Sequence, residues 1–223
     1  MSEENPIQKI FFKKFPSFAL WIYDFKSSMK PISKEEKRIY KTLSPRKAYQ
    51  FKYSRGYIRH SLACLFDMDP LSIPIKALPG KNPLLPNDWG FLSMSHSKDA
   101  LLIGWSKYKL GIDIENANRN FCYRLIANRY FSLEEKDYLK DLNDKDFKNE
   151  VLKMWVKKEA AIKWQNGSLL KDISQWKCLP KSKKSFHLKT GKEINLYFTN
   201  FIDWNISIAS EYQFNKDLIF CRT

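Results

Sequence analysis

Two short acidic segments, about forty residues apart, constrain the fold more than any other feature of this chain. Residues 111–115 read GIDIE, and residues 155–163 read WVKKEAAIK. In the first segment Ile112 and Ile114 alternate with Asp113 and Glu115, so a β-strand would place both isoleucines on one face and both carboxylates on the other. We therefore expect a strand that borders a hydrophobic core on one side and a polar site on the other.

The second segment has the composition of a helix. Glu159 and Lys163 are four residues apart among good helix formers, so they share a helix face with Trp155. A few carboxylates, with the remaining positions left to water and phosphate, suit Mg²⁺. Taken singly, either segment is better explained as ordinary surface structure, for example an ion pair of small energetic value. Their joint order and residue types are what favour a functional site.

Both segments resemble signature motifs of the 4'-phosphopantetheinyl transferases of the surfactin-synthetase-activating type. Those motifs read roughly Gly-[Ile/Val]-Asp-[Ile/Val]-Glu and Trp-[Ser/Thr]-x-Lys-Glu-Ala-x-x-Lys, and this chain departs from the second only at Val156. Three further segments follow the family's order: SMSHS at 93–97 resembles Asn-x-Ser-His-Ser, PGKNPL at 79–84 resembles a Gly-Lys-Pro loop with Asn82 inserted, and SRGYIR at 54–59 resembles a basic helix. The resemblance extends from about residue 40 to about residue 180.

The resemblance implies an α+β fold of two similar α/β subdomains, which are related by a pseudo-twofold axis and have the active site in the cleft between them. Residues 1–106 would contact the coenzyme A phosphates, and residues 107–223 would carry the metal and catalytic residues. The implied reaction is that of a holo-acyl-carrier-protein synthase. It moves 4'-phosphopantetheine from coenzyme A to a serine of an apo acyl or peptidyl carrier protein and releases adenosine 3',5'-bisphosphate.

The resemblance also assigns roles to individual residues. Mg²⁺ or Mn²⁺ would be held by Asp113, Glu115 and Glu159. Glu159 would also act as general base for the carrier serine, directly or through a water, and Lys163 would stabilise charge on the phosphate. Coenzyme A would be bound by Arg46, Arg55, Lys81, Ser95, His96 and Lys158. Within that set Arg55 and His96 would hold the 3'-phosphate or nearby oxygens.

For the carrier protein the candidate contacts follow the first acidic segment: Phe121, Tyr123, Arg124 and Phe131. An acidic carrier helix with an apolar face would suit such a mixed surface. The alternative for Tyr123 and Phe131 is burial in the core, which is the more common fate of aromatic residues.

The net charge of +15 over 223 residues favours anionic ligands and acidic protein partners. Because nucleic acid would benefit as well, a metal-dependent nuclease of the Asp…Glu-x-Lys type and a non-catalytic nucleic-acid binder are the alternatives. The nuclease motif places glutamate and lysine two apart on a strand, and a mere binder leaves both acidic segments unexplained. We expect coenzyme A and an acidic carrier as partners, and no nucleic acid.

Composition adds expectations about the cell compartment. No apolar run approaches the ~20 residues of a membrane helix, and the first residues, MSEEN, lack a secretory pattern. We expect a cytoplasmic protein without membrane contact, and a monomer, since two halves in one chain complete the site. The four cysteines lack Cys-x-x-Cys spacing, so we expect reduced, mostly buried thiols and neither a zinc site nor disulfides.

Periodicity and capping residues predict the element order. Strands are expected near 18–23, 90–94 and 100–105, from 110 onward, and near 194–198, 204–208 and 218–220. Helices are expected after Ser33 and over 46–66, 123–130, 133–142 and 146–164, the last ending at residues 166–167. The proline-rich stretch 69–87 is expected to be a loop.

Overall fold

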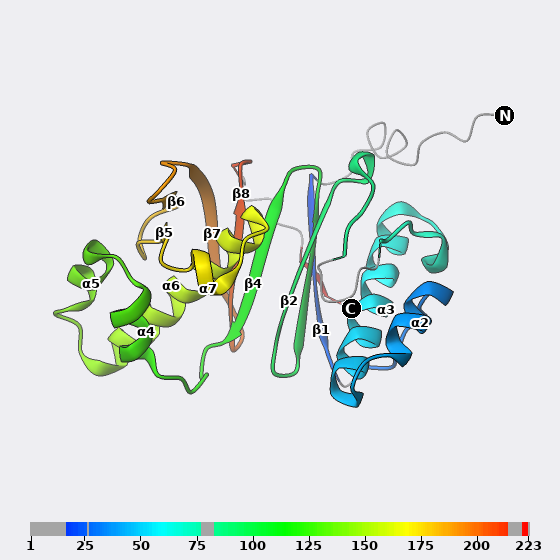
Figure 1. Ribbon diagram of the computed structural model, residues 1–223, viewed down its shortest axis with the longest axis horizontal. Coiled ribbons are helices and arrows are strands. Elements are labelled where there is room, and N and C mark those ends of the chain that lie inside the picture. Colours follow the sequence, from blue (N-terminus) through cyan, green and yellow to red (C-terminus); the bar gives the residue numbers. More distant parts are fainter. Residues whose placement is uncertain (1–16, 26, 77–82, 214–219, 223) are drawn as a thin grey trace.

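Two β-sheets occupy the centre of the molecule, with helices on both sides (Figure 1). The computed structural model describes residues 17–25, 27–76, 83–213 and 220–222. The first sheet has the order β2-β3-β1-β9, built from β1 (Phe18–Asp24), β2 (Phe91–Ser97), β3 (Ala100–Ser106) and β9 (Phe220–Arg222). The second has the order β4-β8-β7-β6-β5, built from β4 (Leu110–Asn116), β5 (Trp176–Lys177), β6 (Lys184–His187), β7 (Glu193–Phe201) and β8 (Trp204–Ser210). An α+β fold is therefore confirmed.

The N-terminal half packs two helices against the first sheet. Helix α2 (Lys34–Lys41) begins at Ser33, as predicted, because Ser33 and Glu36 form a reciprocal capping box. Helix α3 (Pro45–Phe66) buries an aromatic face against the sheet in a core that includes Tyr53, Tyr57, Trp21 and Trp105. The predicted proline-rich loop, 69–87, contains one short 3₁₀ turn, η1 (Pro70–Ser72), and a second, η2 (Asn87–Trp89), begins at its last residue.

The C-terminal half is built around the long helix α6 (Asp144–Gln165), with α4 (Tyr123–Tyr130), α5 (Leu133–Leu139) and α7 (Leu169–Asp172) beside it. Helix α6 ends at Asn166 in a left-handed conformation (φ 59°), as the Asn-Gly pair predicts. Gly111 lets α6 approach β4 closely, because a Cβ at this position would lie 2.1 Å from the carbonyl oxygen of Ala160.

The two halves meet along strands β2 and β4, which are edge strands of their sheets and lie side by side (Figure 1). Ile112 and Ile114 are buried, as predicted, in an apolar cluster that also contains Leu20 and Leu102 of the first sheet. Strand β9 returns the end of the chain to the first sheet, where it pairs in parallel with β1. The pseudo-twofold relation and a boundary between residues 106 and 107 stay predictions.

The cysteine prediction is partly wrong. Cys178 is buried, but Cys64 and Cys122 are exposed, and these three described cysteines are free thiols. The reason is positional: Cys64 lies at a solvent-facing position of α3, and Cys122 lies in the loop that leads into α4. In the described parts of the chain, no helix has the length and hydropathy needed to cross a membrane.

Candidate functional site

A cluster of charged side chains lies between the two halves, on β4 and α6. Lys163 donates from Nζ to Asp113 Oδ1 and to Ser95 Oγ, both at 2.7 Å. The Ser95 hydroxyl in turn donates to Asp113 Oδ1 at 2.6 Å. Asp113 is almost fully buried, whereas Lys163 is partly exposed. The structure thus joins a residue of the first sheet to both acidic segments.

The other two carboxylates of the cluster differ in their surroundings. Glu115 accepts hydrogen bonds from the Ser97 hydroxyl on Oε2 and from the Arg119 guanidinium on Oε1. Burial raises the pKa of Glu115, and Ser97 and Arg119 oppose that rise. Glu159 is half-buried, and burial, followed by the charge of Asp113, raises its pKa to about 8. Lys163 lowers the pKa of Glu159 too little to offset both effects.

The donor set of this cluster fits a hard divalent cation. Asp113, Glu115 and Glu159 supply carboxylate oxygens only, and their charges interact. Asp113 Oδ2 is buried and finds no hydrogen-bond partner among the described residues, which leaves one oxygen free for a ligand. Within the described parts of the chain, however, no three histidine, cysteine or acidic side chains converge closely enough to form a preassembled metal site. The carboxylates would have to draw together around a metal.

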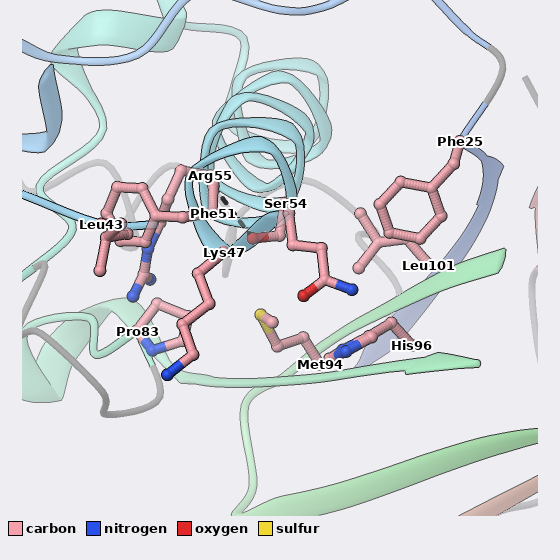
Figure 2. Close-up of a pocket in the computed structure, with 11 residues that line it drawn as sticks. Phe25, Leu43, Lys47, Phe51, Ser54, Arg55, Pro83, Met94, His96 and Leu101 are labelled. Atoms are coloured by element: carbon pink, nitrogen blue, oxygen red, sulfur yellow. Dashed lines mark hydrogen bonds between the residues drawn. The ribbon is translucent and has the colours of Figure 1, made fainter. Parts of the chain in front are cut away.

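A pocket of about 280 Å³ lies on the other side of β2 (Figure 2). Helix α3 forms one wall and β2 the opposite wall, so cationic and polar side chains face each other across an otherwise apolar cavity. It is lined by Phe25, Leu43, Lys47, Gln50, Phe51, Ser54, Arg55, Pro83, Met94, His96 and Leu101. Because side chains alternate along a strand, Ser95 faces the carboxylates while the adjacent His96 faces this pocket. The pocket and the cluster are therefore neighbours on two faces of one strand.

The basic side chains of the pocket differ in their electrostatic properties. Burial lowers the pKa of Arg55 to about 10, and Arg55 still carries its charge at neutral pH. Its guanidinium lies over the Phe51 ring, 5.1 Å from the centroid. Desolvation and the charge of Lys163 lower the pKa of His96, so its ring is neutral near pH 7. The pocket thus offers one fixed cation, one neutral imidazole and the flexible ammonium of Lys47.

Not all residues assigned to coenzyme A reach this pocket. Arg55 and His96 do, and Ser95 lies next to it in the carboxylate cluster. Arg46 is exposed and does not line the pocket. It precedes Arg55 by nine positions in helix α3, which leaves the two side chains on opposite faces of the helix. Lys81 lies outside the described residues.

Lys158 does not face the cluster. It is fully buried, ion-paired with Glu135 at 3.0 Å, and donates to the carbonyl of Trp176. Successive side chains on an α-helix are about 100° apart around its axis. Lys158 therefore points into the core, whereas the adjacent Glu159 points towards β4. Val156, the one departure from the family motif, is also fully buried.

Sequence reasoning missed Lys47, although a signal was available. Lys47, Phe51 and Arg55 follow an i, i+4, i+8 spacing and therefore share one face of α3. Ser97 and Arg119 both contact Glu115; sequence reasoning placed Ser97 in the motif at 93–97 without giving it a role, and it missed Arg119. These two side chains line a second, polar cavity of about 490 Å³ together with Lys98, Glu115, Asn118 and Asn120.

The expected carrier surface is only partly exposed. Phe131 is buried in a core cluster and Tyr123 is partly buried against it, as the alternative for these two residues expected. Phe121 is also partly buried against this cluster. Arg124 is exposed and pairs with Asp144. The apolar side chains that are exposed near these positions are instead Leu125 and Leu133.

Carboxylates beside a basic pocket are typical of a protein that binds a phosphate-bearing ligand next to a divalent cation. Comparison with known families agrees: residues 109–215, 107 of the 223 residues, match the model of the 4'-phosphopantetheinyl transferase superfamily. The matched range contains the carboxylate cluster and helix α6, and β2 and the pocket helix α3 precede it. No curated protein matches the chain.

Proposed function

We propose that this protein is a Mg²⁺-dependent 4'-phosphopantetheinyl transferase of the surfactin-synthetase-activating type, which transfers the group from coenzyme A to a serine of an acidic acyl or peptidyl carrier protein. One observation carries the proposal. The carboxylates of β4 and α6 meet Lys163 at the junction of the halves, next to a basic pocket. The family match over residues 109–215 supports it.

The pocket would hold the nucleotide end of coenzyme A. Arg55 provides a planar fork of donors for phosphate oxygens, and Lys47 adds a mobile charge. His96, neutral near pH 7, would bind phosphate as a hydrogen-bond donor. The apolar side chains of Phe51 and Met94 provide surface for a nucleobase.

The cluster would bind the pyrophosphate. Asp113, Glu115 and Glu159 would hold Mg²⁺ or Mn²⁺, which when bound neutralises the crowded charge of the pyrophosphate. Lys163 lies at Asp113 and would stabilise charge on the transferring or leaving phosphate. Glu159 would also act as general base towards the carrier serine, directly or through a water.

The nuclease alternative is less well supported. Glu159 and Lys163 lie four residues apart on helix α6, whereas the nuclease motif needs glutamate and lysine on a strand. A non-catalytic nucleic-acid binder would explain the positive charge but not the three interacting carboxylates.

Intact-mass spectrometry of an apo acyl carrier protein tests the proposal. With this protein, coenzyme A and Mg²⁺, the carrier should gain ~340 Da, and a chelator should abolish the gain. Glu159→Ala should abolish it too, while Glu150→Ala, a matched change on the same helix, should not. No gain on fatty-acid, polyketide and peptide carriers, with folded protein and bound coenzyme confirmed, would refute the proposal.

A further inference from the structure

Strand β2 presents three serine hydroxyls to strand β4. Ser93, Ser95 and Ser97 alternate along β2 and are all buried, while the residues between them face the other way. Ser93 Oγ accepts from the Ile112 amide at 3.2 Å, and the next two hydroxyls donate to the carboxylates of Asp113 and Glu115. Both strands are edges of their sheets, and the serine hydroxyls form hydrogen bonds between these two edges.

The three serines differ in what they hold. Ser93 serves a backbone amide, which is a structural contact. Ser95 is shared between Asp113 and Lys163. Ser97 donates to a single carboxylate oxygen, Glu115 Oε2.

Two side chains hold the Glu115 carboxylate, each by a different oxygen. Ser97 belongs to the first sheet and draws one oxygen towards β2, beside the hydroxyl that binds Asp113. Arg119 follows β4 in the chain and binds the other oxygen, Oε1, and both Ser97 and Arg119 line the polar cavity. A guanidinium can take both oxygens of a carboxylate in a forked pair. Without the Ser97 hydroxyl, Glu115 would be free to turn fully onto Arg119.

We propose that Ser97 is a positioning residue, which holds the Glu115 carboxylate on the Asp113 side of the cluster so that both can bind one divalent cation. The inference rests on the proposed function. It gives a role to Ser97, which belongs to the motif at 93–97 but has no function assigned there, and which lies outside the range of the family match. Since β2 carries it, the metal site of the C-terminal half would be completed by the N-terminal half.

Direct binding of Mn²⁺ tests the proposal. Free Mn²⁺ is measured by electron paramagnetic resonance with the full chain, without coenzyme or carrier, for wild type, Ser97→Ala, Ser97→Thr and Ser93→Ala. We expect Ser97→Ala to weaken binding about tenfold, as is typical when a hydrogen bond to a ligating side chain is lost. Ser97→Thr keeps the hydroxyl and should restore binding to within about threefold of wild type. Ser93→Ala, on the same face of the same strand, should stay within about twofold.

A second variant separates positioning from general damage to the fold. Arg119→Gln removes the competing cation, so adding it to Ser97→Ala should recover much of the lost Mn²⁺ affinity, which a structural defect would not allow. If Ser97→Ala does not fold, Ser97→Thr and Arg119→Gln still test the idea. In that case the threonine variant should bind Mn²⁺ nearly as wild type does, and Arg119→Gln should tighten binding.

The outcomes separate this proposal from the proposed function. Wild-type affinity in Ser97→Ala, or an equal loss in Ser93→Ala, overturns the role of Ser97 while transfer to the carrier persists. A wild-type protein that binds Mn²⁺ but transfers nothing refutes the proposed function, and the serine comparison still decides the role of Ser97. A wild-type protein that binds no Mn²⁺ overturns the positioning role, whatever the transfer assay shows.

Discussion

Replacing Glu159 with glutamine should stabilise the metal-free protein at mildly alkaline pH and much less near pH 5. In the folded chain, burial and then the charges of Asp113 and Glu115 raise the pKa of this carboxyl from 4.5 to about 8. Between these two values the unfolded chain has released a proton that the folded chain retains, so the unfolded state binds fewer protons. Wild-type stability must then fall as the pH rises through this window. Glutamine has no such proton, so the variant does not share the loss.

The size of the effect follows from the pKa shift. A change from 4.5 to about 8 corresponds to roughly 5 kcal/mol of differential interaction. Glu159 is only half-buried and titrates together with neighbouring carboxylates, which reduces the stability difference. We therefore expect the advantage of Glu159→Gln to grow by ~2 kcal/mol from about pH 5 to about pH 8. For a chain of this length, that equals about 4–8 °C in Tm.

Thermal and urea unfolding, followed by circular dichroism in the presence of a chelator, measure this difference across the pH range. Glu150→Gln is the matched control, since Glu150 lies on the same helix and is paired with Lys153. A difference between Glu159→Gln and wild type that does not change with pH would refute the reasoning. The same pH trend in Glu150→Gln would assign the effect to the helix as a whole.

Three further predictions concern packing and the pocket. Gly111→Ala should lower the free energy of unfolding by about 1–3 kcal/mol in urea denaturation, because its Cβ would overlap backbone of α6; an unchanged midpoint would contradict this. Lys47→Ala should weaken coenzyme A binding about tenfold by calorimetry, with Arg46→Ala as the near-neutral control, and equal losses would contradict the placement of the pocket. Lys158→Met should lower the free energy of unfolding by about 3–5 kcal/mol, because it leaves the buried Glu135 carboxylate without its ion-pair partner. Adding Glu135→Gln to this variant should recover part of the loss, and no recovery would rule out the ion pair as the cause.

The sequence predicted most elements because their signals are local. The capping box at Ser33, the Asn-Gly end of α6 and the alternation in β4 each depend on residues within a few positions of one another. Helix α5 was predicted to reach Leu142 but ends at Leu139, since its last turn gives way to the turn before α6. The chain's end was expected to form a strand at 218–220; residues 218–219 lie outside the described residues, and residue 220 is in strand β9 (Phe220–Arg222), which pairs with β1.

The sequence by itself determined which residues could do chemistry and which of them share a face. It put Asp113 with Glu115, and Glu159 with Lys163, because strand and helix periods fix those relations. Only the tertiary structure decided which faces meet. The rotation of α6 against β4 buried Lys158 and aimed Lys163 at Asp113, and the meeting of two sheet edges brought Ser97 to Glu115. Contacts between residues far apart in the chain depend on packing of whole elements, which no local pattern records.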